Sequence, residues 1–275
     1  MPLSALDLYR DVLPRTNCGE CGFPTCLAFA SMVVSEQLPL EKCPHLSAET
    51  VASCQAELQA QYAAGKWTRR DMGRDALEWA RQRSASMKIS DLPERIGGRL
   101  VDRNGQPALA LPYFNDVVFI ITDGVTREDG TSLTHYEQVF ILNHMAQGGR
   151  AEPTGKWKGL VEIPNTVSKI KSMKSHVEEP LKKAFAGKLD QLQAAAARLG
   201  GKNVTGDIGS ADAAIYFQAL PRVPLLLMFW DAEPDDGFEP EARLLFDETI
   251  TQHLDIESIM FLSERLRQLL CDPPV

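Results

Sequence analysis

The sequence lacks the loop motifs that most nucleotide-dependent and hydrolytic enzymes carry. It contains no Walker phosphate-binding loop, no G-x-G-x-x-G after a predicted strand, no H-E-x-x-H and no G-x-S-x-G. Each of these motifs places backbone N–H groups, a metal ion or a nucleophile where the chemistry needs it. Their absence argues against a nucleotide-driven or hydrolytic enzyme, and the sequence identifies no catalytic residue.

Long apolar runs and targeting signals are also missing. The longest apolar run, VPLLLMFW at 223–230, has the length of a strand and falls far short of the ~20 residues of a membrane span. The N-terminal MPLSALDLYRDVLPR has no basic start followed by an apolar core, so it does not read as a secretory signal. We therefore predict a cytoplasmic protein without a membrane span.

Basic residues are too few for a nucleic-acid-binding surface. The 275 residues include 29 Lys and Arg against 37 Asp and Glu, a net charge of −8. Phosphate binding needs a concentrated basic surface, so we expect no nucleic acid among the partners. A hydrophobic content of 44% in a chain of this length supports one large domain or two unequal ones.

Cysteine is scarce but concentrated near the N-terminus. Four of the six cysteines are Cys18, Cys21, Cys26 and Cys43, and a glycine follows each of the first two. The cytosol keeps thiols reduced, so clustered cysteines there bind metal or do redox work more often than they form disulfides.

The spacing C-x2-C-x4-C, followed after sixteen residues by C-P, favours a [4Fe–4S] cluster over zinc. A structural zinc site usually pairs two C-x2-C knuckles or adds a histidine pair, and only Cys18 and Cys21 form a knuckle here. A cubane cluster instead needs one thiolate per iron, delivered from different directions. Gly19 and Gly22 let the backbone turn tightly and direct N–H groups at sulfur. A helix beginning near Cys26 would point its N-terminal end at the cluster. Zinc stays the alternative.

The segments LPRTNCGECGFPTCLAFA and CPHLS resemble the small iron–sulfur module of the large subunit of the corrinoid iron–sulfur protein. That protein works in the carbon monoxide dehydrogenase/acetyl-CoA synthase pathway of anaerobic metabolism. A related module occurs in the B subunit of the Rnf electron-transport complex, where a glycine-rich stretch usually follows the last cysteine. The resemblance covers roughly residues 3–64 and implies four cluster ligands, Cys18, Cys21, Cys26 and Cys43. No corrinoid-protein barrel follows, and the remainder is similar to a bacterial family in which this module precedes a domain of unknown function.

We predict three parts: a helical cluster-binding module at 1–65, a basic helical linker at 66–97 and an α+β domain at 98–275. In the module, helices are expected over 3–13, from Thr25 to before Pro39, and from the N-cap Ser47 to Gly65. The linker is expected to hold a helix over about 70–83. Its basic residues form either a docking surface, for an acidic redox partner or for the protein's own acidic domain, or a solvated face. They are Arg69, Arg70, Arg74, Arg81, Arg83, Lys88 and Arg95.

From Gly98 the hydrophobic pattern alternates with a period of two, which predicts an antiparallel meander. Further predicted elements are a helix at 134–146, a short strand within 155–164, helices at 176–187 and 189–201, strands at 212–220 and 223–231, and a helix at 256–271. Strands and helices are grouped rather than alternating, which favours an α+β fold with a mostly antiparallel sheet.

The remaining candidate residues each have a functional and a structural interpretation. Cys54 is a spare ligand or a buried core residue, and Cys271 a bystander thiol. His135 and His144 are nine residues apart and point to different sides of a helix, so either one alone, or His253, could be an axial ligand to haem or a corrinoid.

Near the last cysteine, His45 either donates a hydrogen bond to a cluster sulfur or faces solvent. Lys169, Lys171 and Lys174 near His176 form an anion site or a solvated surface. The stretch DAEPDDGFEPE at 231–241 reads as an acidic loop rather than a calcium site.

The leading hypothesis is an iron–sulfur protein that carries one [4Fe–4S] cluster and transfers single electrons to a redox partner protein, with a corrinoid or another metallocentre as acceptor. A second hypothesis makes the C-terminal domain a carrier or reductive enzyme that binds a corrinoid, haem or small molecule. A third is an interaction adaptor that senses redox state.

Overall fold

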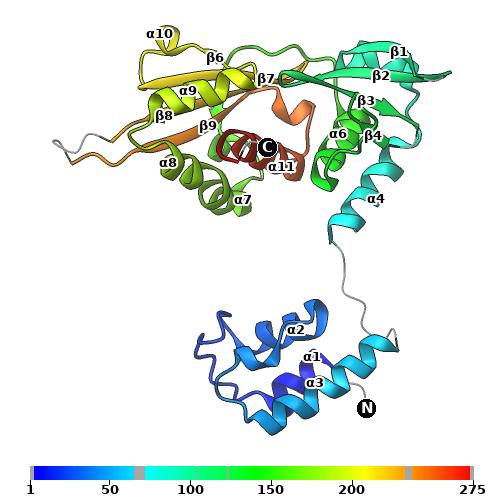
Figure 1. Cartoon of the computed structure of the whole chain (residues 1–275), viewed down its shortest axis with the longest axis vertical. Helices are drawn as coiled ribbons and strands as arrows, with labels where there is room; N and C mark the ends of the chain where they lie inside the picture. The colour runs from blue at the N-terminus through cyan, green and yellow to red at the C-terminus, as the bar shows by residue number, and fades with distance from the viewer. Residues whose placement is uncertain (1–2, 65–71, 104, 123, 233–236, 273–275) are drawn as a thin grey trace. The chain divides into compact units, whose positions relative to one another are not determined.

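The computed structural model describes residues 3–64, 72–103, 105–122, 124–232 and 237–272. The chain divides into two compact units, Met1–Asp75 and Ala76–Val275 (Figure 1). Each unit has its own hydrophobic core, and the two sets of core residues do not overlap.

The first unit is helical. Its elements are α1 (Ala5–Asp7), η1 (Leu8–Val12), α2 (Cys26–Glu36), η2 (Leu40–Lys42) and α3 (Ala48–Ala63). Helices α1, α2 and α3 each begin at a hydroxyl side chain that accepts a hydrogen bond from the backbone N–H three residues on, namely Ser4, Thr25 and Ser47. The predicted starts at Thr25 and Ser47 are therefore confirmed, whereas the predicted stop at Gly65 lies outside the described residues.

The core of the first unit is small and includes three thiols. Leu8, Phe29 and Leu40 are fully buried, and Cys26, Cys43 and Cys54 lie among them. Cys54 sits on the buried stripe of α3, where the structural interpretation places it.

The predicted linker contains α4 (Met72–Ser84), η3 (Ile89–Asp91) and α5 (Leu92–Ile96). Leu77 and Ala80 of α4 are buried in the core of the second unit. Arg83 pairs with Asp255 at 3.2 Å, and Arg95 donates to backbone carbonyls near the end of the following helix. Some of the basic residues are thus tied to the second unit. Arg69, Arg70 and the side chain of Arg74 lie outside the described residues.

The second unit contains two antiparallel sheets. The first has the order β1-β2-β3-β4, formed by β1 (Arg99–Arg103), β2 (Gln106–Tyr113), β3 (Asp116–Ile121) and β4 (Gly124–Thr126), and it confirms the predicted meander. The second has the order β5-β9-β8-β7-β6, formed by β5 (Trp157–Gly159), β6 (Lys202–Asn203), β7 (Ala213–Leu220), β8 (Val223–Trp230) and β9 (Glu241–Asp247).

Helices pack on these sheets and complete the core of the second unit (Figure 1). They are α6 (His135–Gln147), η4 (Leu160–Glu162), α7 (Val167–Met173), η5 (Lys174–Glu178), α8 (Glu179–Phe185), α9 (Leu189–Arg198), α10 (Thr205–Ile208), η6 (Ile250–Gln252) and α11 (Ile256–Cys271). One face of β8 contributes Leu225, Leu227 and Phe229 to this core. The other face contributes Leu226 and Met228 to a smaller cluster. The α+β class and the antiparallel pairing are as predicted, but the strands form two sheets where one was expected.

Some elements differ from the prediction. The helical segment expected at 176–187 begins earlier, at Val167, and continues through three consecutive helical stretches to Phe185. Strand β9 begins at Glu241, the last residue of the acidic stretch, and was not predicted, nor were β6 and α10. Strand β9 is stabilised by pairing with β8 and β5 on its two sides, which its local sequence does not reveal. Within the described residues, no helix combines the length and apolar character needed to cross a membrane.

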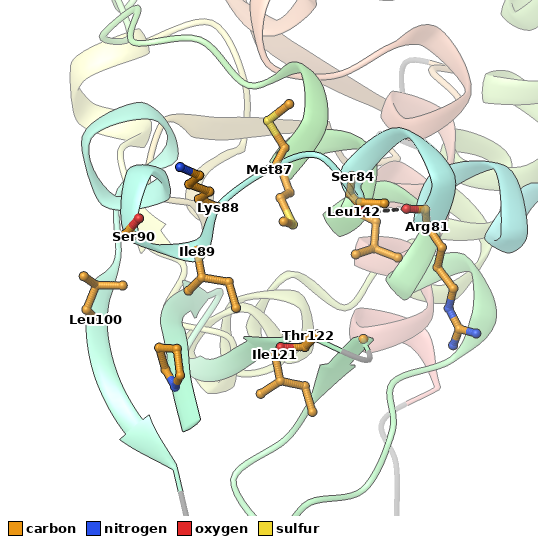
Figure 2. Close-up of a pocket in the computed structure, with 14 residues that line it drawn as sticks. Arg81, Ser84, Met87, Lys88, Ile89, Ser90, Leu100, Ile121, Thr122 and Leu142 are labelled. Atoms are coloured by element: carbon orange, nitrogen blue, oxygen red, sulfur yellow. Dashed lines mark hydrogen bonds between the residues drawn. The ribbon is translucent and has the colours of Figure 1, made fainter. Parts of the chain in front are cut away.

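A cavity of about 820 Å³ opens where α4, the segment after it, the first sheet and α6 meet (Figure 2). Met87, Ile89 and Leu142 surround the hollow, and Ile121 of β3 with the following Thr122 closes another side (Figure 2). All of its described lining residues belong to the second unit, whereas the four clustered cysteines belong to the first.

Candidate functional site

The four clustered cysteines lie around one end of α2. Cys18 and Cys21 belong to the loop before α2, Cys26 is the first residue of that helix, and Cys43 directly follows η2. Cys26 and Cys43 are 7% and 6% exposed, Cys21 is half-buried and Cys18 is exposed. The group thus has a buried side against the core and an exposed side at Cys18.

The loop that carries the first two cysteines turns tightly. Arg15, Asn17, Gly19 and Gly22 all have positive φ angles, of 59°, 52°, 80° and 86°. No atom lies closer than 4.0 Å to the position that a Cβ would take at Gly19 or Gly22, so conformation rather than crowding favours glycine there. The Asn17 side-chain oxygen accepts a hydrogen bond from the Cys26 backbone N–H at 2.8 Å, which ties the loop to the start of α2.

The electrostatics of Cys43 show that the four thiols are neighbours. Burial raises the pKa of Cys43, and the negative charges of Cys21, Cys26 and Cys18 raise it further. Several thiolates that repel one another in a partly buried site are stabilised by cations that neutralise their negative charge. Four thiol donors in one place, one for each iron, fit the donor set of a cubane cluster.

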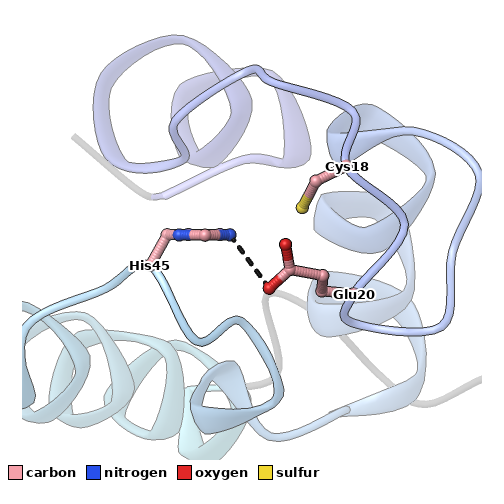
Figure 3. A group of neighbouring side chains, drawn as sticks. All are labelled: Cys18, Glu20 and His45. Atoms are coloured by element: carbon pink, nitrogen blue, oxygen red, sulfur yellow. Dashed lines mark ion pairs between the residues drawn. The ribbon is translucent and has the colours of Figure 1, made fainter.

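Glu20 and His45 lie beside the exposed thiol (Figure 3). The ligand atoms of Cys18, Glu20 and His45 all lie within 4.8 Å of one another. Hydrogen bonds from the Glu20 backbone N–H, Thr16 and His45 lower the pKa of the Cys18 thiol. The hydrogen bond to Cys18 and the charge of Glu20 raise the pKa of His45. These three residues could hold one metal ion, but that arrangement would leave the buried Cys26 and Cys43 unused.

His45 was expected either to donate a hydrogen bond to a cluster sulfur or to face solvent, and it combines features of both. Its Nε2 lies 3.3 Å from a Glu20 carboxylate oxygen, and its side chain is 42% exposed. It therefore contacts the cysteine group and solvent at once.

Comparison with known proteins supports an iron–sulfur protein. Residues 13–45 match the family described as "Putative Fe-S cluster", and this range contains all four clustered cysteines. The corrinoid/iron-sulfur protein large subunit of Moorella thermoacetica is 53% identical over 47 residues, which are 17% of this chain and 10% of the relative. The resemblance of the first module is confirmed.

Archaeal relatives match the same module. The acetyl-CoA decarbonylase/synthase complex subunit gamma of Methanothermobacter thermautotrophicus is 43% identical over 49 residues, 18% of this chain and 10% of the relative. The subunit gamma 1 of Methanosarcina thermophila is 50% identical over 46 residues, 17% of this chain and 10% of the relative. The chain spans about a tenth of the length of these curated relatives. No solved structure matches the chain.

The second unit decides the family. Residues 88–269, about two thirds of the chain, match the family described as "Domain of unknown function (DUF3786)". The chain belongs to the DUF3786 family. The matched range contains both sheets and the helices from α5 to α10; it begins after α4 and ends within α11.

The cavity of the DUF3786 domain is apolar and has a cationic rim. Its walls include the buried Leu142 and Met145 of α6, and among the described lining residues only Arg81 and Lys88 are charged. Within the described part of the chain, neither cation has a carboxylate partner in an ion pair. The same lining offers two methionine thioethers but no imidazole and no thiol.

The fold of the DUF3786 domain pairs two histidines that are far apart in the sequence. The rings of His144 and His253 are 5.8 Å apart, and both side chains are fully buried. His144 Nδ1 lies 3.1 Å from the His253 carbonyl, and His253 Nε2 lies 3.0 Å from the Ala151 carbonyl. Burial lowers the pKa of His144 to about 4 and also lowers the pKa of His253. Both rings are therefore neutral parts of the core, and neither lines the cavity; His135 is exposed at the start of α6.

The predicted lysine cluster is partly neutralised. Lys169 pairs with Glu257 at 2.5 Å, and His176 lies 3.4 Å from Glu264, so both face carboxylates of α11. In the acidic stretch, Glu239 pairs with Lys182 at 3.6 Å. Residues 233–236 of that stretch lie outside the described residues.

Sequence reasoning missed one ionic site of the DUF3786 domain. Glu137 is buried between Tyr113, Arg127 and Arg265, which come from three different segments. The pattern Thr134-x-x-Glu137 is a capping-box signal that the sequence does contain. Nothing local marks the arginines, because each is a single charge on an otherwise mixed surface.

Proposed function

We propose that the first unit binds one [4Fe–4S] cluster through Cys18, Cys21, Cys26 and Cys43 and serves in one-electron transfer. The observation that carries this proposal is the convergence of four thiols, two buried and two towards solvent, in a segment that matches an iron–sulfur family. A bound cluster of this type supplies one-electron redox chemistry.

The surroundings of the thiols suit that role. Cys26 and Cys43 lie in the hydrophobic core, which excludes water from one side of the site. Cys18 lies on the exposed side, where a partner can approach. His45 and the Glu20 backbone N–H stabilise negative charge on the Cys18 sulfur, whereas the Glu20 carboxylate opposes it.

We further propose a cytoplasmic redox partner protein, with a corrinoid or another metallocentre as the electron acceptor. The support is the similarity of the first module to subunits named for a corrinoid/iron-sulfur protein and for the acetyl-CoA decarbonylase/synthase complex. The similarity ends with that module, so the DUF3786 domain does not indicate the acceptor.

Anaerobic purification tests the cluster directly. We expect about four iron and four sulfide per chain and an EPR signal after one-electron reduction. A colourless protein that contains zinc in place of iron contradicts the proposal. Electron exchange with a small reductant that is slow despite a full cluster would favour the redox-sensing adaptor over the carrier.

The cavity of the DUF3786 domain supports a second candidate function, the binding of a corrinoid, haem or small organic cofactor. Its volume of about 820 Å³ and its apolar walls suit such a molecule. Among the described lining residues only Met87 and Met145 offer a soft ligand atom. Titration with hydroxocobalamin and with haemin, followed by visible spectroscopy, should produce a shifted band in the wild type. A band that persists when Leu142 is replaced by Trp, which fills the cavity, argues against this site.

A further inference from the structure

We propose that the DUF3786 domain carries a second site, a pocket ringed by arginines that binds a small organic oxyanion. The ligand class is a carboxylate or phosphate monoester attached to an aromatic or branched apolar body. This site is independent of the cysteines and of the cavity beside α4.

The pocket has a volume of about 420 Å³ and lies at the β2–β3 turn. Phe114 and Leu199 contribute apolar surface, and Leu269 of α11 adds to it. Three arginines and one carboxylate supply its charges; they are Arg127, Arg198, Arg265 and Asp116. The lining therefore carries a surplus of two positive charges, three minus one.

The buried Glu137 holds two of these arginines, Arg127 and Arg265, in place. Its side chain is 1% exposed, and its Oε1 accepts hydrogen bonds from Arg265 Nε at 2.8 Å and from the Tyr113 hydroxyl at 3.1 Å. Arg127 Nη2 lies 3.5 Å from the same oxygen. The other oxygen accepts from the backbone and hydroxyl of Thr134 at 3.0 and 2.8 Å. A buried carboxylate with this many partners holds both guanidinium groups in place before a ligand arrives.

The arginines keep donors for an anion. Arg198 has no carboxylate partner within the described residues. Arg265 uses Nε on Glu137 and Nη1 on Gln268, which leaves Nη2 without an acceptor in the described part of the protein. A guanidinium fork matches the two oxygens of a carboxylate or phosphate. Even when the buried Glu137 is counted, the charges sum to +1, three arginines against two carboxylates.

Phe114 explains the apolar half of the ligand. It lies in the two-residue turn between β2 and β3 with a φ of 51°, at a turn position where glycine is the usual residue. Its backbone N–H donates to the Ala219 carbonyl at 3.0 Å, and its ring packs edge-on against Tyr113 and Phe217. The fold thus holds the Phe114 ring beside the arginines, although its backbone conformation is one that residues with a large side chain rarely adopt.

A single oxyanion fits better than a polyphosphate. The described residues around the pocket provide no glycine-rich loop to surround several phosphates, and Asp116 would repel additional negative charge. The apolar walls would also leave a small inorganic anion without contacts on one side.

Isothermal titration of the full-length, cluster-loaded chain tests the pocket. The probes are benzoate and phenyl phosphate, with acetate, inorganic phosphate and benzylamine for comparison. We expect one of the two aromatic anions to bind with a dissociation constant at least about tenfold lower than that of its inorganic or methyl counterpart, and benzylamine not to bind. The preference between benzoate and phenyl phosphate identifies the oxyanion. Absence of binding by both overturns the proposal.

Three substitutions and a control locate the binding. Arg198→Gln should weaken binding about tenfold because it removes a charge-assisted pair. Asp116→Asn removes a negative charge, frees Arg127 Nη1 and should tighten binding. Phe114→Asn tolerates the positive φ but lacks the ring, so the preference for benzoate over acetate should fall. Arg243→Gln changes an exposed arginine of β9 outside the pocket and should have no effect. Equal weakening by Arg198→Gln and Arg243→Gln would mean non-specific charge attraction and would overturn the proposal.

Discussion

The six cysteines differ in what surrounds each thiol. The Cys54 side chain lies on the buried face of α3, and Cys271 is half-buried at the end of α11. Burial raises the pKa of both thiols. No other cysteine is among the charges that shift the pKa of either thiol, whereas three cysteines act on Cys43, so Cys54 and Cys271 stand apart from the clustered group. The other four converge, and Cys18 among them has a lowered pKa.

Replacement of single cysteines should separate ligands from bystanders. Serine at Cys26 or Cys43 should strip or destabilise the cluster, because one iron would lose its thiolate. Serine at Cys54 is the matched control, since that thiol is also buried in the first unit. Iron and sulfide content per chain is the measurement. Equal iron loss in the Cys54 variant would show that the ligand assignment is wrong.

The buried histidine pair should make the second unit sensitive to acid. The pKa of His144 is about 4 in the folded chain, against 6.5 for an exposed histidine. The unfolded chain therefore binds a proton between these values that the folded chain does not. Stability is complete above pH 6.5 and falls as the pH drops towards 4. Between pH 7 and pH 5 His144 alone should cost about 2 kcal/mol of unfolding free energy. His253 acts in the same direction, and the nearby charges of Arg222 and Arg95 oppose protonation of His144 too.

Urea unfolding at the two pH values tests this effect. Three of the four tryptophans, Trp79, Trp157 and Trp230, belong to the second unit and report on it by fluorescence. His144→Gln should reduce the pH dependence, whereas His135→Gln, at an exposed position at the start of α6, should leave it unchanged. An unaltered pH dependence in His144→Gln would refute the explanation.

At the scale of elements, caps and turns define where helices stop. Gly148 ends α6 with a φ of −49°, a conformation open to any residue. There is, however, no room for a side chain at this position. A Cβ there would lie 2.4 Å from the His144 carbonyl oxygen and 2.5 Å from an Ile96 methyl group. This glycine therefore allows the end of α6 to pack against α5.

Alanine at Gly148 should lower the free energy of unfolding by about 1–3 kcal/mol, because the neighbouring backbone has to move. Gly206 in α10 provides the control, since a Cβ added there would meet nothing within 4 Å and its φ is not positive. Gly206→Ala should leave stability unchanged or raise it by up to ~1 kcal/mol. Urea unfolding measures both. Similar losses in the two variants would point to backbone flexibility rather than crowding.

At the scale of the whole molecule, the two units differ in what stabilises them. The core of the first unit is small and includes Cys26 and Cys43, whereas the core of the second contains none of the four clustered cysteines. So short a unit buries little apolar surface and should need its metal. We keep the division into module, linker and domain as a proposal, with α4 now assigned to the core of the second unit through Leu77 and Ala80.

Truncation and iron chelation test this division. A chain that begins at Met72 should fold without iron. A chain that begins at Ser90 should also fold, but with about 2–4 kcal/mol less stability, because it lacks the buried Leu77 and Ala80. Calorimetry of the full chain should show two transitions, of which chelation removes only one. A single transition that disappears with the cluster would mean that the two units unfold as one.

Much of the architecture could be predicted because its signals are local. Ser47 and Thr25 mark helix starts by hydrogen bonds to residues three positions on. The meander follows from alternating side chains and short turns, so β1 to β4 were foreseen. Strand β9 was not predicted, because its seven residues are held by pairing with β8 on one edge and β5 on the other. Even the nearest of these pairs, Trp230 with Glu241, joins residues 11 positions apart.

The sequence by itself determined the cysteine motif, the iron–sulfur chemistry expected of it and the class of fold. These follow from spacing and periodicity, which act over a few residues of chain. Only the tertiary structure brought His144 to His253 and Glu137 to Arg265, and only it formed the two pockets of the DUF3786 domain. The two residues of each pair are more than a hundred positions apart in the sequence. They meet because α6 packs against α11 and η6, and neither local hydrogen bonds nor hydrophobic periodicity can predict that packing.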